Sequence, residues 1–138
     1  MAAWQGFLRS HVVLLDTLDA ELVERHALPL AWYDVLVQLH ESGGSSAMGA
    51  LAERLLISPS TCTRVVERMA SAGFVERRVG EPDARVRVAE LTPAGRRMLR
   101  AASVTHLAGI RRYFAAHIDE TEAQLLAAIF DRIGRSLR

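Results

Sequence analysis

Apolar residues recur at steps of three and four along the start of the chain, which predicts a long helix over residues 4–26. Its stripe comprises Trp4, Leu8, His11, Leu15, Leu18 and Leu22. Pro29 suits the first turn of a second helix that runs to about Ser42. The apolar stripe of that helix comprises Trp32, Val35, Leu36 and Leu39. The run SGGSS at 42–46 then predicts a break in the chain.

Two short helices and a hairpin are expected after this break. The apolar face of the first helix comprises Met48, Leu51, Ala52 and Leu55. After the link LIS, Ser58 suits the N-cap and Pro59 the first turn of a helix that runs to about Ser71. Two strands are predicted near 74–79 and 85–91, joined by GEPDA. A hairpin that directly follows the second helix of a helix-turn-helix pair predicts a winged helix.

Two longer helices complete the pattern. Thr92 and Pro93 repeat the signal of a cap followed by a proline, and predict a fifth helix that runs to about His117. Asp119 and Glu122 have the spacing of a capping box for a sixth helix. The apolar stripe of this sixth helix comprises Leu125, Leu126, Ile129, Phe130, Ile133 and Leu137.

The predicted fold is mainly α with a small β-hairpin wing, in a single domain over residues 1–138. Residues 30–92 form a winged helix-turn-helix lobe, flanked by N- and C-terminal dimerisation helices at 1–28 and 93–138. The first and last helices carry full apolar stripes, yet they have few partners within one small subunit. We therefore expect a second copy of the chain to cover them in a homodimer.

Composition narrows the class of protein. Half of the 138 residues are hydrophobic, which is enough for one core, and no apolar run approaches the length of a membrane span. The start of the sequence lacks the pattern of a secretory signal. The single cysteine, Cys62, excludes an internal disulfide, and we interpret it as a small core residue rather than a redox sensor. We expect a cytoplasmic protein without membrane partners.

The distribution of charge points to an anionic partner. Residues 1–45 hold six acids and two arginines, whereas residues 54–100 hold ten arginines and five acids. A solvated face that is balanced elsewhere is the alternative. All 17 basic residues are arginine, so the chain has no lysine for Schiff-base or phosphate-loop chemistry. No nucleophile with a neighbouring base is recognisable, so we predict that the protein is not an enzyme and needs no cofactor.

The fourth helix has the composition of a recognition helix. At 100° per residue, its apolar residues fall on one side, and small hydroxyls, two arginines and a single acid, Glu67, fall on the other. Small polar residues allow a helix to lie deep in the major groove, where arginine reads guanine. An ordinary solvated face is the alternative. The candidate DNA contacts in and beside this helix are Ser58, Ser60, Thr61, Thr63, Arg64, Arg68 and Arg77.

The wing segment DARVRVAELTPAG resembles that of the MarR (multiple-antibiotic-resistance regulator) family of transcription regulators, with Asp83, Arg85 and the run Leu-Thr-Pro-x-Gly in register. ISPSTCTRVVERMASAGFVERR resembles the family's recognition helix, and LAWYDVLVQL its second helix. The resemblance implies a homodimer that binds a pseudo-palindromic double-stranded DNA operator, usually as a repressor, and that a small, often phenolic or aromatic effector releases. Asp83 is expected to shape the turn, Arg85 to enter a minor groove, and Arg87 to face phosphate.

Two positions depart from the family pattern. Ala84 stands where the wing tip often has a further arginine, which predicts fewer contacts between the wing and DNA. Leu56 stands where a glycine is common in the helix-turn-helix link, which predicts a wider turn.

An effector pocket is predicted near His11, Trp32, Tyr33 and His40, and a phenol or aromatic acid would suit it. The alternatives are an interface role for His11 and a core role for Trp32. Metal sensing would need Glu24, Glu41, His40 and His106 to converge, but the histidines lack metal-binding spacing, so no metal site is predicted. The main alternative function is a winged-helix module that binds proteins and never touches DNA.

Overall fold

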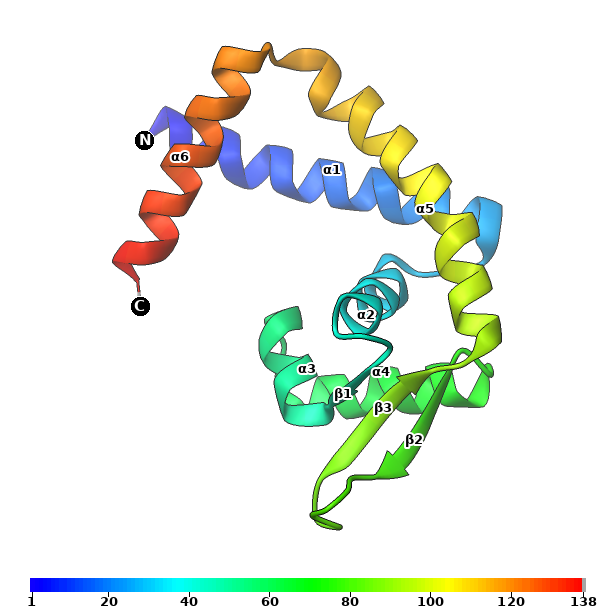
Figure 1. The fold of residues 1–138 in the computed structure, drawn as a ribbon. Helices are drawn as coiled ribbons and strands as arrows, with labels where there is room; N and C mark the ends of the chain where they lie inside the picture. The colour runs from blue at the N-terminus through cyan, green and yellow to red at the C-terminus, as the bar shows by residue number, and fades with distance from the viewer. Residues whose placement is uncertain (138) are drawn as a thin grey trace.

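The computed structural model describes residues 1–137, and these form six α-helices, a short 3₁₀ helix and three strands (Figure 1). In chain order the elements are α1 (Ala2–His26), α2 (Leu30–Glu41), β1 (Ser45–Ala47), α3 (Met48–Leu55), α4 (Pro59–Ser71), β2 (Val75–Val79), β3 (Arg87–Leu91), α5 (Pro93–Tyr113), η1 (Ala115–His117) and α6 (Glu120–Ser136). This order confirms the predicted winged helix with a long helix at each end.

The helix starts that the sequence predicts are formed by side-chain caps. Ser58 Oγ accepts a hydrogen bond from the backbone N–H of Thr61, and Thr92 Oγ1 accepts one from Gly95. Asp119 and Glu122 make both bonds of a capping box at the start of α6. Each cap satisfies a backbone donor that the first turn of a helix leaves free, so these boundaries follow from local sequence.

Four boundaries differ from the prediction. Pro29 is the N-cap of α2 and so precedes the first turn in which it was predicted, and α5 ends at Tyr113 rather than His117. The second wing strand begins at Arg87, because residues 83–86 form the turn. Ser45 and Ser46, predicted as part of a break, form β1 together with Ala47.

The wing is therefore a three-stranded antiparallel sheet in the order β1-β3-β2. Ser45 lies opposite Glu90, and Val79 lies opposite Arg87. A strand as short as β1 is stable only because β3 supplies its hydrogen-bond partners from a distant part of the chain.

The core of the lobe lies between α2, α3, α4 and the sheet. Its fully buried side chains include Leu36, Leu39, Leu51, Val66 and Met69. Cys62 is buried with them, as predicted, and burial raises the pKa of its thiol. The start of α5 packs tightly on the base of the wing, where a Cβ atom on Gly95 would lie 2.1 Å from the carbonyl oxygen of Phe74.

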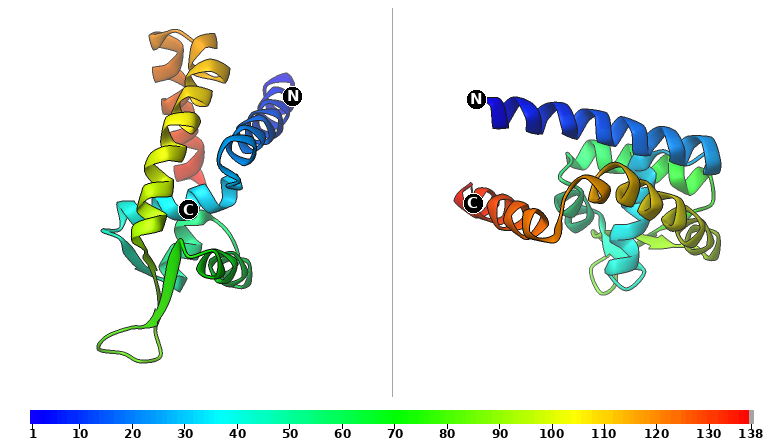
Figure 2. Two further views of the ribbon diagram at one scale, coloured as in Figure 1. Left: turned by 90° about the vertical axis from the view of Figure 1, so that its right-hand side faces the viewer. Right: turned by 90° about the horizontal axis from the view of Figure 1, so that it is seen from above.

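The helices α1 and α5 extend away from this lobe, and α6 then turns back from the far end of α5 to the level of α2 (Figure 1, Figure 2). The C-terminal half of α1 packs on α5: Tyr113 Oη donates a hydrogen bond to Glu21 Oε1 at 2.5 Å, and Leu18 lies against Gly109. The N-terminal half of α1 meets α6 through the rings of Phe7 and Phe130, whose centroids are 5.8 Å apart. No residue of α6 is buried within one subunit.

Candidate nucleic-acid interface

The outward face of α4 presents short hydroxyl side chains between arginines. Ser60, Arg64 and Arg68 are exposed, whereas Cys62 and Val66 on the opposite face are buried. The hydroxyl of Thr61 lies 3.3 Å from a terminal nitrogen of Arg64, which leaves other guanidinium donors of Arg64 free to bind. Thr63 Oγ1 donates to the carbonyl oxygen of Pro59 at 3.0 Å, so this hydroxyl is already paired with the helix backbone in the free protein.

The turn at the wing tip is organised by Asp83. Its Oδ1 accepts hydrogen bonds from the backbone N–H of Arg85 at 3.0 Å and from Arg85 Nε at 3.3 Å. These two bonds hold the pKa of the Asp83 carboxyl below its ordinary value. The side chain of Arg85 remains 92% exposed, so Asp83 orients this guanidinium without burying it.

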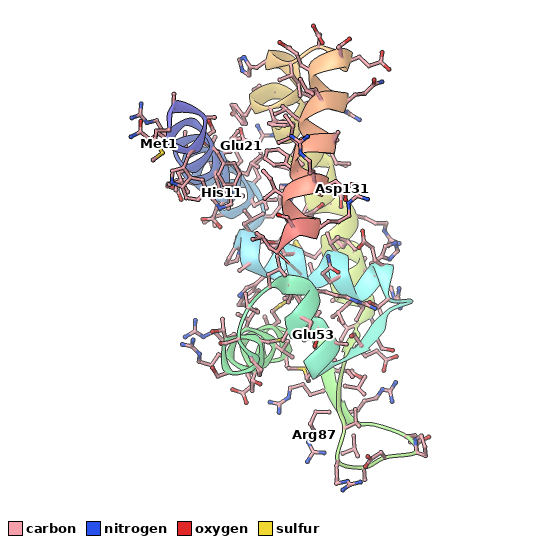
Figure 3. All side chains as sticks on the ribbon, turned by 90° about the vertical axis from the view of Figure 1, so that its left-hand side faces the viewer. Met1, His11, Glu21, Glu53, Arg87 and Asp131 are labelled. Atoms are coloured by element: carbon pink, nitrogen blue, oxygen red, sulfur yellow. The ribbon has the colours of Figure 1, made fainter. Side chains whose placement is uncertain are left out.

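Arg87 occupies the first position of β3 and donates a hydrogen bond to the carbonyl oxygen of Ala84 at 2.9 Å. Figure 3 shows Arg87 on the wing, at the other end of the molecule from His11. Arg85 and Arg87 do not share a face of one strand, because Arg85 belongs to the turn. The wing therefore places two guanidinium groups at different depths, one at the tip and one where the strand begins.

Carboxylates pair with two other arginines at the base of the wing. Arg77 Nη1 lies 2.9 Å from Glu67 Oε1, and this pair joins β2 to α4. Arg78 Nε lies 2.8 Å from Glu90 Oε2, and this pair joins β2 to β3. Among residues 1–137, no acid lies within ion-pair distance of Arg64, Arg68 or Arg87.

The link between α3 and α4 is tight, which corrects the expectation of a wider turn. Leu56 adopts the left-handed conformation, with φ 56° and ψ 39°, where a glycine would be favoured. Its N–H donates to the carbonyl of Glu53, and the N–H of Ile57 donates to that of Ala52. Leucine therefore forms the same turn that glycine would, at a conformational cost.

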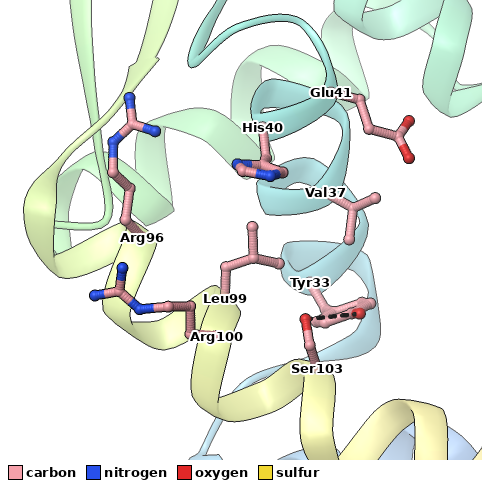
Figure 4. Close-up of a pocket in the computed structure, with 8 residues that line it drawn as sticks. All are labelled: Tyr33, Val37, His40, Glu41, Arg96, Leu99, Arg100 and Ser103. Carbon is pink, nitrogen blue, oxygen red and sulfur yellow. Dashed lines mark hydrogen bonds between the residues drawn. The ribbon is translucent and has the colours of Figure 1, made fainter.

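A second site, a cleft of about 470 Å³, lies between α2 and α5 (Figure 4). It is lined by Tyr33, Val37, His40, Glu41, Arg96, Leu99, Arg100 and Ser103. The imidazole of His40 and the guanidinium groups of Arg96 and Arg100 lie on one side of the cleft, whereas Glu41 points the other way. Tyr33 Oη is hydrogen-bonded to Ser103 Oγ at 3.2 Å, which ties the two helices together at one end of the cleft.

The four predicted ligand residues do not come together. Tyr33 and His40 line the cleft, as their shared edge of α2 implied. Trp32 instead packs its ring edge against Phe74, and His11 stacks on Phe7 in the exposed part of α1.

Arg96 and Arg100 also line this cleft, although neither is among the predicted ligand residues. Their signal in the sequence is the run RRMLR at the start of α5, which belongs to the arginine-rich segment 54–100 and does not by itself indicate a cleft.

The comparisons with known proteins agree with this arrangement. Residues 26–86 match the sequence model of the MarR family. The whole fold resembles AbsC, a MarR family transcriptional regulator from Streptomyces coelicolor, with a TM-score of 0.94 and 30% identity over 99% of this chain and 93% of AbsC. The chain belongs to the MarR family. It is therefore a DNA-binding transcriptional regulator with a winged helix, and the prediction that it is not an enzyme is confirmed.

Two further solved structures are similar to this chain. Sco3205, a MarR family regulator from S. coelicolor solved in complex with DNA, has a TM-score of 0.94 and 26% identity over 99% of this chain and 86% of Sco3205. CouR from Rhodococcus jostii RHA1, solved with bound p-coumaroyl-CoA, has a TM-score of 0.79 and 27% identity over 93% of this chain and 90% of CouR. No curated protein sequence matches the chain.

The described part of this MarR protein contains no candidate membrane-spanning helix and no cluster of metal-ligating side chains. Within residues 1–137, no helix is long and apolar enough to cross a membrane. Over the same residues, no three His, Cys, Asp or Glu side chains are grouped so that they could hold a metal ion.

Proposed function

We propose that this MarR protein is a homodimeric cytoplasmic repressor that binds a pseudo-palindromic operator in double-stranded DNA, and that a small aromatic or phenolic acid releases it. The observation that carries the DNA-binding part is the surface formed by α4 and the wing. An outward face of small hydroxyls with Arg64 and Arg68 stands beside a wing whose Arg85 is almost fully exposed. Such a helix fits the major groove, and such an arginine fits the adjacent minor groove.

The contacts divide by role. Arg64 lies near the middle of the exposed face of α4 and is the candidate for reading a base edge. Ser58, Ser60, Thr61 and Thr63 surround the start of this helix, whose amide groups and hydroxyls suit phosphate oxygens. Arg87 suits a phosphate contact because it lies away from the wing tip. The DNA-bound structure of the relative Sco3205 supports the proposal of a DNA surface over that of a protein-binding module.

Dimerisation is supported by the apolar surface that one subunit leaves uncovered. The exposed large apolar side chains of α1, α5 and α6 include Trp4, Leu8, Val12, Val104, Leu107, Leu125 and Ile133. Monomeric proteins rarely expose a contiguous apolar surface of this kind. A symmetric pairing of these helices buries it and presents two recognition helices to two half-sites, about 34 Å apart on one side of the duplex.

The effector proposal rests on the cleft between α2 and α5. Tyr33 and Leu99 supply apolar surface for an aromatic ring, and the paired donors of Arg96 and Arg100 suit a carboxylate or phenolate. The ligand-bound structure of CouR supports a small-molecule site in this family. α2 belongs to the DNA-binding lobe, and α5 connects that lobe to the exposed helices. A ligand that favours a different angle between α2 and α5 therefore changes the spacing of the recognition helices and weakens operator binding.

Selection from a random duplex library followed by a salt titration tests the DNA-binding function. A repressor of this kind enriches a two-fold symmetric site, and its affinity falls steeply as salt rises.

A stable monomer of about 15 kDa in light scattering contradicts the dimer. Salicylate and p-coumarate serve as probes for the cleft. Binding of either probe without any change in affinity for the selected site contradicts the proposed release.

A further inference from the structure

The recognition helix carries one acidic residue, on the face that is proposed to meet DNA. Glu67 is the only acid in α4, and its side chain is about half exposed. A carboxylate at this position is repelled by the phosphates of a duplex. It is therefore expected to weaken binding unless a particular partner compensates its charge.

Arg77 compensates this charge in the free protein. Its Nη1 lies 2.9 Å from Glu67 Oε1, and the side chain of Arg77 is 38% exposed. Arg77 and Arg78 lie on opposite faces of β2. Arg77 lies opposite the buried Ala89 of β3, so it is on the face of the sheet that is turned toward α4. The pair therefore spans the angle between α4 and the base of the wing, where both elements are proposed to approach one duplex.

An ion pair this exposed contributes little to stability, so Arg77 can exchange Glu67 for a phosphate oxygen at small cost. The exchange leaves the carboxylate of Glu67 facing the edges of the bases. Among the groups in the major groove, the N4 amino group of cytosine is the usual donor to a glutamate. A carbonyl oxygen or N7 at the same place is an acceptor and repels it.

We propose that Glu67 is a specificity-determining residue that releases Arg77 to the DNA backbone only where a cytosine amino group takes its place. This inference rests on the proposed DNA-binding function. On other sequences the Glu67–Arg77 pair stays closed, so Arg77 adds nothing to non-specific binding. One carboxylate then both favours the operator and weakens binding elsewhere.

The Arg78–Glu90 pair provides a matched control. It has the same chemistry and a similar distance of 2.8 Å, and both of its side chains are also about half exposed. Arg78 lies opposite Val88, and Glu90 lies two residues farther along β3, so the two share one face of the sheet. This is the face opposite the one that carries Arg77 and the buried Ala89, and it points away from α4.

The test uses the full-length protein and four variants: Glu67→Gln, Arg77→Ala, the double variant of these two, and Glu90→Gln. Sites are first selected from a random duplex library with the wild type and with Glu67→Gln. Affinities are then measured for the selected duplex and for a scrambled duplex of the same composition, at several salt concentrations.

Glu67→Gln is expected to bind the scrambled duplex about tenfold more tightly, because Arg77 is free to reach phosphate, and to lose a similar factor of discrimination. The salt dependence on the scrambled duplex is expected to steepen by about one phosphate contact per subunit. When Arg77→Ala is added to Glu67→Gln, both the tighter binding of the scrambled duplex and the steeper salt dependence are expected to disappear. One cytosine per half-site becomes degenerate in the selection, whereas Glu90→Gln leaves the discrimination ratio unchanged.

Equal losses on both duplexes for Glu67→Gln, or retention of every selected position, overturn the inference and leave Glu67 a structural residue. A change of the discrimination ratio by Glu90→Gln that equals the change by Glu67→Gln also overturns it, since the effect is then one of net charge. If the wild type itself binds no duplex in a salt-dependent way, the proposed function fails, and the inference fails with it.

Discussion

Replacing Leu56 by glycine is expected to stabilise the protein, although the change removes a large apolar side chain. An L-residue in the left-handed region costs about 1–2 kcal/mol relative to its relaxed conformations. Glycine avoids this cost but loses about 0.5–1 kcal/mol through the greater freedom of the unfolded chain. The leucine side chain is 91% exposed, so little burial is lost. The net gain is about 0.5–1 kcal/mol, which corresponds to a rise in Tm of about 2–4 °C for a chain of this size.

The assay is thermal unfolding followed by circular dichroism at one fixed protein concentration, because the Tm of a dimer depends on concentration. Leu56→Ala is the control, since alanine removes the side chain but keeps the strained backbone, and its Tm is expected to change little. Operator affinity should be equal in all three proteins. A fall in Tm for Leu56→Gly refutes the reasoning, because it means that the leucine side chain contributes more than the backbone conformation costs.

Three further predictions concern the wing, its base and the junction of the helices. Arg85→Ala and Asp83→Ala should each weaken operator binding. Because Asp83 acts by orienting Arg85, the losses of binding free energy should be less than additive in the double variant. Gel-shift titrations at one salt concentration measure the operator affinity of each variant. Gly95→Ala should destabilise the fold by about 1–3 kcal/mol or more in urea unfolding, because the new methyl group collides with the Phe74 carbonyl. Burial lowers the pKa of His106, so the unfolded chain binds more protons than the folded one once the pH falls below about 6.5. Stability should therefore be lost as the pH falls below that value, and His106→Gln should flatten this part of the pH profile.

Local sequence was sufficient for the helices and for most of their ends. Ser58, Thr92 and Asp119 each satisfy backbone donors within three residues of themselves, so their effect does not depend on the rest of the fold. The apolar spacing of α4 likewise determines which side is buried and leaves Arg64 and Arg68 outside. The resemblance of the wing segment implied that Asp83 shapes the wing turn, and this effect is also local, because its partner is only two residues away.

Tertiary structure decided whatever depends on residues far apart in the chain. β1 has no strand pattern of its own and exists because β3 lies beside it. The cleft required the packing of α2 against α5, which brought Arg96 and Arg100 to Tyr33 and left Trp32 and His11 elsewhere.

The same reason applies to the pairing of charges on the DNA-binding surface. Sequence alone showed Glu67 as one acid among arginines, and only the angle between α4 and β2 gave it Arg77, ten residues away, as its partner. Apolar periodicity and capping depend on residues that are close together in the chain. A cleft or an ion pair between two elements depends instead on how those elements pack. The sequence by itself therefore determined the class of protein and its exposed arginines, and the packing determined which of those arginines are free to bind.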